Sequence, residues 1–139
     1  MARLVVLALL LSSRLALAAD TLPPLVQLAA SPAEGKRIFL QREAGHCVLC
    51  HQVAGLDAPF QGNLGPDLTG VGSRLTAAQI RLRIVDASRL NPDTIMPPYY
   101  RREGLEQVAE AYRGRTVLSA EQIEHLVAWL ASLEQADGE

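Results

Sequence analysis

The pattern of apolar and polar positions predicts three amphipathic helices joined by long loops. Each helix opens with a Ser or Thr followed three residues later by a Glu or Gln, the arrangement of a capping box. These openings occupy residues 31–34, 76–79 and 119–122. Because all three precede apolar residues at helical spacing, together they predict helices more strongly than any one alone.

The last predicted helix has the clearest amphipathic pattern. Its apolar residues fall on one stripe at helical period: Ile123, Leu126, Val127 and Leu130. His125 falls between them, and we expect it on the opposite, solvent-facing side. The middle helix is expected over residues 76–86. Its inward residues are Ile80, Ile84 and Ala87.

The first predicted helix carries Gly35 and Phe39 one turn apart. A bare backbone patch beside a large ring favours a close crossing with another helix, although Gly35 alone is also compatible with a merely tolerated weak spot. No segment alternates apolar and polar residues as a strand does, so we expect an all-α domain. Residues 52–73 and 88–104 are rich in Gly and Pro, and loops this long are usually functional or wrapped around something.

The N-terminus has the pattern of a secretory signal peptide over residues 1–19. A basic start at Arg3 precedes a short apolar run, and small residues follow at the expected cleavage region. The run is shorter than the roughly 20 residues that span a bilayer, so we expect cleavage near Ala18 or Ala19 rather than a membrane anchor.

The remaining 20–139 is long enough for one domain, and residues 20–30 are expected to form an extended arm. Without the signal peptide the chain has 11 basic and 15 acidic residues, a net charge of 11 − 15 = −4. This field repels phosphate and excludes nucleic acid as a partner. Aromatic residues make up only 4% of the chain, so either the core is loosely built or something other than side chains fills it.

The candidate chemistry lies in "GHCVLCHQV", residues 45–53, which contains both cysteines of the chain, Cys47 and Cys50, followed at once by His51. A redox dithiol requires a βαβ unit that the pattern does not predict. A structural zinc site requires four ligands, and no second ligand pair is evident. A disulfide between residues three apart closes too small a loop to contribute much, and it leaves His51 unexplained.

The interpretation that we favour is C-x-x-C-H, the attachment motif of a covalent haem c. Both thiols then bind the haem vinyl groups, and His51 lies under the iron. Export favours this interpretation, since haem is attached outside the cytoplasm. The shortage of aromatic residues favours it too, because a porphyrin fills the core.

Met96 is the candidate for the second axial iron ligand, since Met1 leaves with the signal peptide. It lies in a loop stiffened by Pro97 and Pro98, and a thioether favours reduced iron. The alternative is a buried Met that fills a gap. Three other candidates are expected to lie too close to the motif or to face away: His46, His125 and Lys36.

Residues 64–74 form a second informative loop. The carbonyl of Pro66 is a candidate acceptor for the His51 Nδ1 proton, a bond of the kind that orients ligand imidazoles. Arg74 either pairs with a haem propionate or is an ordinary solvated charge before a helix, and its spacing leaves both interpretations open.

The haem motif, the Gly-Pro-x-Leu-x-Gly loop, the Met loop and the flanking helices together resemble class I cytochrome c over nearly the whole exported chain. This resemblance implies an all-α fold of three main helices with long loops around one covalent haem. It implies that Cys47 and Cys50 bind the haem and that His51 and Met96 bind the iron. It also implies a Pro66 contact to His51 and a propionate contact at Arg74.

The segment "NPDTIMPPYYR" is similar to the SoxX family, the monohaem subunits of SoxAX complexes. That resemblance implies a periplasmic heterodimer with a SoxA-like haem subunit, which joins thiosulfate to a carrier-protein cysteine (the L-cysteine S-thiosulfotransferase type). The reactive cysteine belongs to SoxA. This chain then supplies no catalytic residue and passes electrons to a downstream cytochrome.

Two other functions stay open at this point. The first is a freestanding electron shuttle of the same fold, serving an oxidase or reductase. The second is a gas-binding or peroxidase-like enzyme, which needs an open sixth iron site. Arg101, Arg102, Arg113 and Arg115 flank the Met loop, and they form either a docking rim for an acidic partner or a solvated surface.

Overall fold

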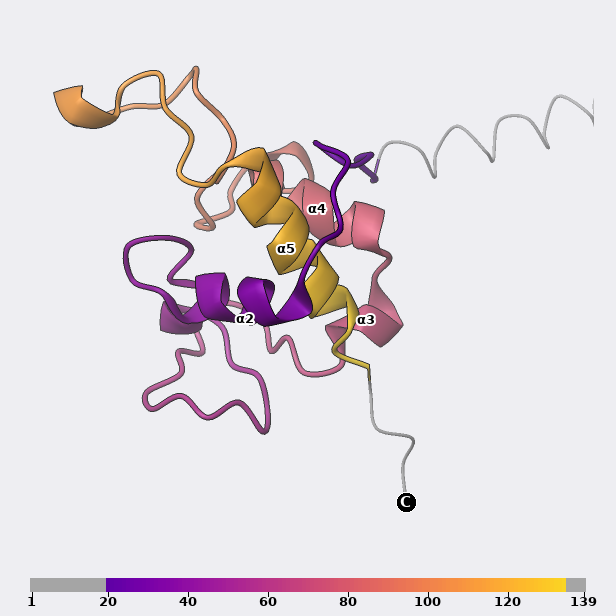
Figure 1. The fold of residues 1–139 in the computed structure, drawn as a ribbon. Coiled ribbons are helices and arrows are strands. Elements are labelled where there is room, and N and C mark those ends of the chain that lie inside the picture. Colours follow the sequence, from indigo (N-terminus) through magenta and orange to yellow (C-terminus); the bar gives the residue numbers. More distant parts are fainter. Residues whose placement is uncertain (1–19, 135–139) are drawn as a thin grey trace, which may run out of the picture.

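The computed structural model describes residues 20–134. It contains four α-helices, with the labels of Figure 1: α2 (Pro32–Leu40), α3 (Val71–Arg74), α4 (Ala77–Asp86) and α5 (Ala120–Ala131). Three 3-10 helices accompany them: η1 (Cys47–Leu49), η2 (Ala87–Arg89) and η3 (Glu110–Tyr112). The described residues form no strand, which confirms the predicted all-α class. The predicted signal peptide, with its expected cut near Ala18 or Ala19, lies outside the described residues.

The capping residues begin the three long helices where the sequence predicts. The side chains of Thr76 and Ser119 each accept a hydrogen bond from the backbone N–H three residues on. The side chain of the Gln at that position accepts in turn from the backbone N–H of the capping residue, so α4 and α5 have complete capping boxes. In α2 only half of the box forms: Ser31 Oγ accepts from Glu34 N–H, whereas the Glu34 carboxylate binds Arg37 instead.

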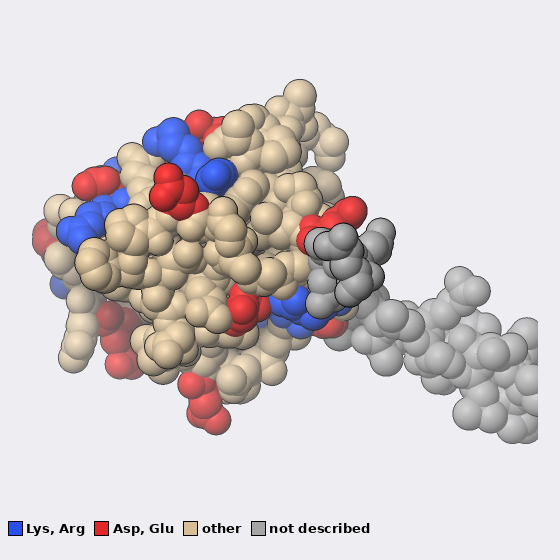
Figure 2. Space-filling model, turned by 90° about the horizontal axis from the view of Figure 1, so that it is seen from below, with Lys and Arg blue, Asp and Glu red and all other residues tan. Residues whose placement is uncertain are grey.

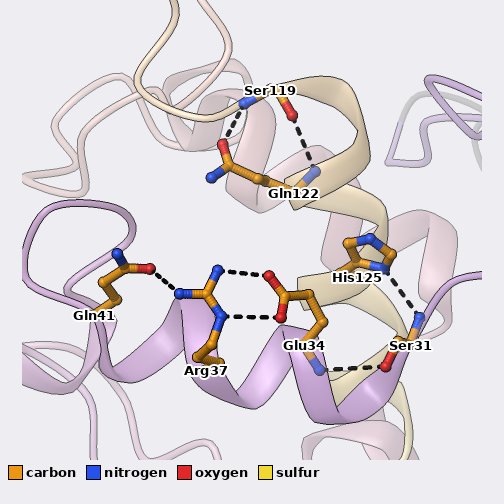
Figure 3. Close-up of polar contacts among 7 residues, drawn as sticks. All are labelled: Ser31, Glu34, Arg37, Gln41, Ser119, Gln122 and His125. Carbon is orange, nitrogen blue, oxygen red and sulfur yellow. Dashed lines mark hydrogen bonds and ion pairs between the residues drawn. The ribbon is translucent and has the colours of Figure 1, made fainter.

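His125 supplies the missing half of the α2 cap (Figure 3). Its Nδ1 accepts a 2.9 Å hydrogen bond from the backbone N–H of Ser31. The expectation that His125 faces solvent is therefore wrong: the side chain is half-buried and points toward the start of α2. The helical period placed it off the apolar stripe correctly, but α2 crosses α5 on that side.

The crossing of α2 and α5 is as close as Gly35 and Phe39 predict (Figure 1). A Cβ at Gly35 would overlap the carbonyl oxygen of His125 and lie 2.7 Å from Trp129 Cβ. The Phe39 ring packs on Trp129, with 4.8 Å between ring centroids. The two helix backbones thus meet at the glycine, and the aromatic pair closes the contact beside it.

The apolar stripe of α5 is buried as predicted, and so are Ile80 and Ile84 of α4. Ala87 is only half-buried, because α4 ends at Asp86 and η2 follows. No pattern in the sequence predicts the ion pair that is buried between α4 and α5. Arg81 Nε and Nη2 donate to the two carboxylate oxygens of Glu124 at 2.8 and 2.7 Å, and both side chains are almost fully buried.

Residues 20–30 run across α4 and α5 without helix or strand (Figure 1). The N–H of Leu22 donates to Ala78 O, and its carbonyl accepts from Arg81 Nη1 at 2.8 Å. The N–H of Leu25 donates to Glu124 Oε1 at 2.9 Å. The buried ion pair therefore also binds this N-terminal arm to the two helices.

The segment between Arg101 and Leu118 projects from the helical body, with η3 near its tip (orange in Figure 1). No helix among residues 20–134 is both long and apolar enough to cross a membrane.

Candidate haem site

The two cysteines lie on one tight turn. Cys47 begins η1, and the backbone N–H groups of Cys50 and His51 both donate to its carbonyl oxygen, at 3.1 and 2.9 Å. His46, just before the turn, has a left-handed backbone with φ of 45°. Both cysteines have free thiols, and each residue as a whole keeps some exposure to solvent. The turn thus holds the two cysteines and the following histidine close together in one short segment.

His51 is oriented by the loop that the sequence singled out. Its Nδ1 lies 2.7 Å from the carbonyl oxygen of Pro66. A carbonyl only accepts hydrogen bonds, so Nδ1 must carry the ring proton. In the neutral imidazole the lone pair is then on Nε2, the nitrogen that a ligand histidine offers to a metal.

Gly65 packs directly against the His51 ring. A Cβ at this position would lie 2.7 Å from Nδ1 and 2.8 Å from Nε2 of the imidazole. The Gly65 N–H also donates to the carbonyl of Cys50 at 2.8 Å, and Gly62 N–H donates to Val48 O at 2.9 Å. Two backbone bonds therefore clamp this loop to the cysteine turn, and only glycine leaves room for the ring.

Cys47 does not have the properties of a reactive thiol. Burial raises the pKa of the Cys47 thiol to about 12, with the neighbouring Cys50 thiol adding to the rise. A redox dithiol reacts as a thiolate, which a raised pKa disfavours. No cluster of three or more His, Cys, Asp or Glu side chains suited to a metal ion occurs in the described part of the chain. A thioether bond to a haem, by contrast, requires no thiolate in the finished protein.

Arg74 ends α3 and turns back onto the same loop. Its guanidinium donates to the carbonyl oxygens of Thr69 and Asp67, the latter at 3.0 Å. The Asp67 carboxylate in turn accepts from Thr69 N–H at 2.7 Å and from Gln52 Nε2 at 2.9 Å. These contacts fix residues 67–74 as a unit. A propionate contact at Arg74 stays a prediction.

Met96 is half-buried in the loop after η2. Its backbone N–H donates to Thr94 Oγ1 at 3.2 Å. The end of this loop is held by Tyr99, whose hydroxyl donates to the carbonyl oxygen of Gly45 at 2.9 Å. The fold thus ties the Met96 segment to the residues just before the cysteine turn.

These residues fit a covalent haem. Two thiols are available three residues apart, the His51 ring has its Nε2 lone pair free of the Pro66 bond, and Gly65 packs against that ring. Large apolar side chains of the same segments are exposed, and a bound porphyrin would cover part of their surface. They are Leu49, Leu64 and Ile95.

Sequence reasoning missed Tyr99 as part of this site, although it pointed to the loop that contains it. Its bond partner, Gly45, lies 54 residues away along the chain. No local pattern reports a contact between a side chain and so distant a carbonyl. The Gly65 contact had a visible signal, since a Gly-Pro pair follows the haem motif in the sequence.

This chain matches the model of a known protein family. The family model described as cytochrome c matches residues 32–134, which is most of the chain. The chain therefore belongs to the cytochrome c family, with an electron-transfer domain that carries one covalent haem c in the region of Cys47 and Cys50. None of the curated proteins searched matches this chain.

Among solved structures, the chain is similar to one chain of "Crystal structure of SoxXA from P. pantotrophus". The two are 32% identical with a TM-score of 0.77, and the match covers 84% of this chain and 92% of the other. This likeness supports the narrower resemblance to the SoxX type of cytochrome c and the class I cytochrome c fold.

Proposed function

We propose that Cys47 and Cys50 hold the haem through thioether bonds and that His51 and Met96 are the axial iron ligands. The observation that carries this assignment is the 2.7 Å contact between His51 Nδ1 and Pro66 O, which leaves Nε2 for the iron. When bound, the haem supplies a one-electron couple that a thioether ligand tunes toward the reduced form.

The chain's own residues orient and enclose this group. Pro66 and Gly65 fix the plane and tautomer of the His51 ring. Arg74 stiffens the loop over residues 67–74 and is the candidate partner of a haem propionate. Because a doubly ligated iron has no open position, this arrangement favours electron transfer over binding of gases or peroxide.

We further propose that this protein acts as the SoxX-type subunit of a SoxAX complex in the periplasm, in a heterodimer with a SoxA-like haem subunit. The support is the 32% identity to a chain of the SoxXA structure over 84% of this chain. In such a complex thiosulfate is joined oxidatively to a carrier-protein cysteine, and the electrons pass to a downstream cytochrome. With both cysteines bound to haem, this chain has no nucleophile to offer and serves as the electron-transfer subunit.

The ligand assignment is tested by the Met96→Ala variant of the ferric holoprotein. We expect loss of the weak far-red band that a thioether gives with ferric iron, and gain of carbon monoxide binding in the reduced state. The unchanged protein should keep the band and bind no carbon monoxide. Survival of the band in the variant would assign the sixth position to another group.

The partner assignment is tested by purification from native periplasm. A stable 1:1 complex with a second haem subunit supports the SoxAX role. A monomer that exchanges electrons freely with an oxidase or reductase supports the alternative, a freestanding shuttle of the same fold.

A further inference from the structure

Tyr99 connects three parts of the fold on which the haem site depends. Its hydroxyl donates a 2.9 Å hydrogen bond to the carbonyl oxygen of Gly45, two residues before Cys47. Its backbone N–H donates to Ile84 O in α4 at 3.2 Å, and its own carbonyl accepts from Leu118 N–H at 3.0 Å. One residue therefore contacts α4, the segment leading into α5 and the entrance to the cysteine turn.

The side chain is built into the molecule rather than placed on its surface. The Tyr99 ring is half-buried and packs against the main apolar core. Burial raises the pKa of Tyr99 above its ordinary value, so the hydroxyl stays protonated and remains a donor over the whole usable pH range. The Gly45 carbonyl, which only accepts, matches that donor.

Tyr99 follows Met96 after only two residues, Pro97 and Pro98. A proline fixes its backbone φ near −65°, so this linker is short and stiff. A shift of Tyr99 is therefore transmitted to Met96, whereas a flexible linker would absorb it. The bond to Gly45 also joins positions 54 residues apart, and it is the one side-chain hydrogen bond among the described contacts that links the Met96 loop to the cysteine segment.

We infer that Tyr99 is a positioning residue, which holds the Met96 loop against the haem-binding turn and so keeps the Met96 sulfur at the iron. The inference rests on the proposed ligation by Met96. The hydrogen bond from Tyr99 then contributes to the free energy that must be overcome when an outside ligand replaces the Met96 sulfur at the iron.

The test is a titration of the ferric holoprotein with imidazole, which competes with Met96 for the iron. Tyr99→Phe removes the hydroxyl and keeps the ring in the core. We expect imidazole to bind roughly three- to tenfold more tightly to this variant, because an ordinary hydrogen bond no longer holds the loop closed. The far-red band should still be present before imidazole is added.

Tyr100→Phe is the matched control. The Tyr100 backbone N–H donates to Val85 O at 3.3 Å, but its hydroxyl makes no hydrogen bond among the described residues. Its imidazole affinity should equal that of the unchanged protein. If Tyr99 only stabilised the fold, Tyr99→Phe would lower the unfolding midpoint and leave the imidazole affinity of the folded protein unaltered.

An imidazole affinity of Tyr99→Phe within twofold of the unchanged protein overturns the inference, and so does an equal increase in Tyr100→Phe. The Met96→Ala variant separates the two possible failures. If it loses the far-red band while Tyr99→Phe changes nothing, only the positioning role is wrong. If it keeps the band, Met96 is not the ligand and both assignments fall.

Discussion

The His51 ring is held by backbone atoms and by the absence of a side chain. Pro66 contributes a carbonyl oxygen, and Gly65 has no side chain at a place where any Cβ would overlap the imidazole. These contacts require a particular residue only at position 65, and otherwise they require the backbone to follow the right path. The acceptors of the Arg74 guanidinium are likewise backbone atoms, the carbonyl oxygens of Thr69 and Asp67.

Asp67 makes the stability of this loop depend on pH. Hydrogen bonds from Thr69 are the main reason why the pKa of Asp67 is lowered, with Gln52 and Arg74 adding to the effect. A group whose pKa is lower in the folded state stabilises the fold fully above its unfolded pKa, and it loses that contribution as the pH falls through the folded pKa. We therefore expect the holoprotein to lose stability as the pH falls through the range in which Asp67 becomes protonated.

The Asp67→Asn variant should be less stable than the unchanged protein at neutral pH and should show a smaller loss on acidification. Denaturant unfolding of the holoprotein over a series of pH values measures both effects. Asp57→Asn is the control, since Asp57 is an exposed carboxylate of the neighbouring loop. Equal pH slopes for Asp67→Asn and the unchanged protein would contradict this role.

At this scale the sequence predicted part of the site. The positions of Cys47, Cys50 and His51, and the value of Pro66 as an acceptor, followed from spacing and from the chemistry of each group. The partners of Arg74 and Tyr99 did not follow. Every residue has a backbone carbonyl, and whereas a Gly-Pro pair beside the haem motif pointed to the carbonyl of Pro66, no such pattern points to the carbonyls that Arg74 and Tyr99 use.

The helices show the same division between local and distant causes. Capping residues and apolar period are local, and they placed the starts of α2, α4 and α5, and the end of α4, within a residue of those observed. The pairing of helices is not local. For that reason His125 was assigned to solvent, and Arg81 and Glu124 gave no sign that they would be buried together.

The crossing of α2 with α5 depends on Gly35. In Gly35→Ala the new Cβ meets the His125 carbonyl, a backbone atom that cannot move away without shifting α5. We expect a net destabilisation of about 1–3 kcal/mol, since overpacking outweighs the better helix propensity of Ala. Denaturant unfolding of the holoprotein measures it.

Lys36→Ala, an exposed change at the next position of α2, should alter the stability by only roughly 0.5 kcal/mol or less. If Gly35→Ala proved as stable as this control, the close contact between the two helices would be absent.

The ion pair between Arg81 and Glu124 holds α4, α5 and the N-terminal arm together. Glu124→Gln leaves the buried Arg81 guanidinium without its counter-charge and weakens the contact to Leu25 N–H. Removal of one partner from a buried pair typically costs about 3–5 kcal/mol. We expect a loss of that order in unfolding free energy, with earlier proteolytic cleavage within residues 20–30.

Glu121→Gln serves as the comparison, because Glu121 is exposed on the first turn of the same helix. It should leave the rate of arm cleavage unchanged. Equal cleavage rates for the two variants would show that the pair does not secure the arm.

The charge of the whole molecule gives little support to a single docking field. On the face in Figure 2, charged side chains of both signs are interspersed among a mostly uncharged surface. Of the four arginines proposed as a rim, Arg101 instead pairs with Asp86 at 3.2 Å, and Arg113 pairs with Glu110 at 3.0 Å. Arg102 and Arg115 line a neighbouring surface hollow and stay candidates for partner contacts.

The size of the core indicates how far the fold depends on its prosthetic group. Only one close aromatic pair, Phe39 with Trp129, occurs among the described residues, and the segments around the cysteine turn leave large apolar side chains exposed. Burial of apolar surface stabilises the folded state. A haem covering those side chains would contribute to stability in this way, and the thioether bonds would keep it attached to the chain.

We therefore expect the chain with Cys47→Ser and Cys50→Ser, which cannot attach haem, to lose most of its helical far-ultraviolet circular dichroism signal and its cooperative thermal transition. The matched control is Met96→Ala, which keeps both thioether bonds and should keep its helices even though its iron ligation changes. A haem-free chain that melts cooperatively at the temperature of the holoprotein would show that the side chains alone specify the fold.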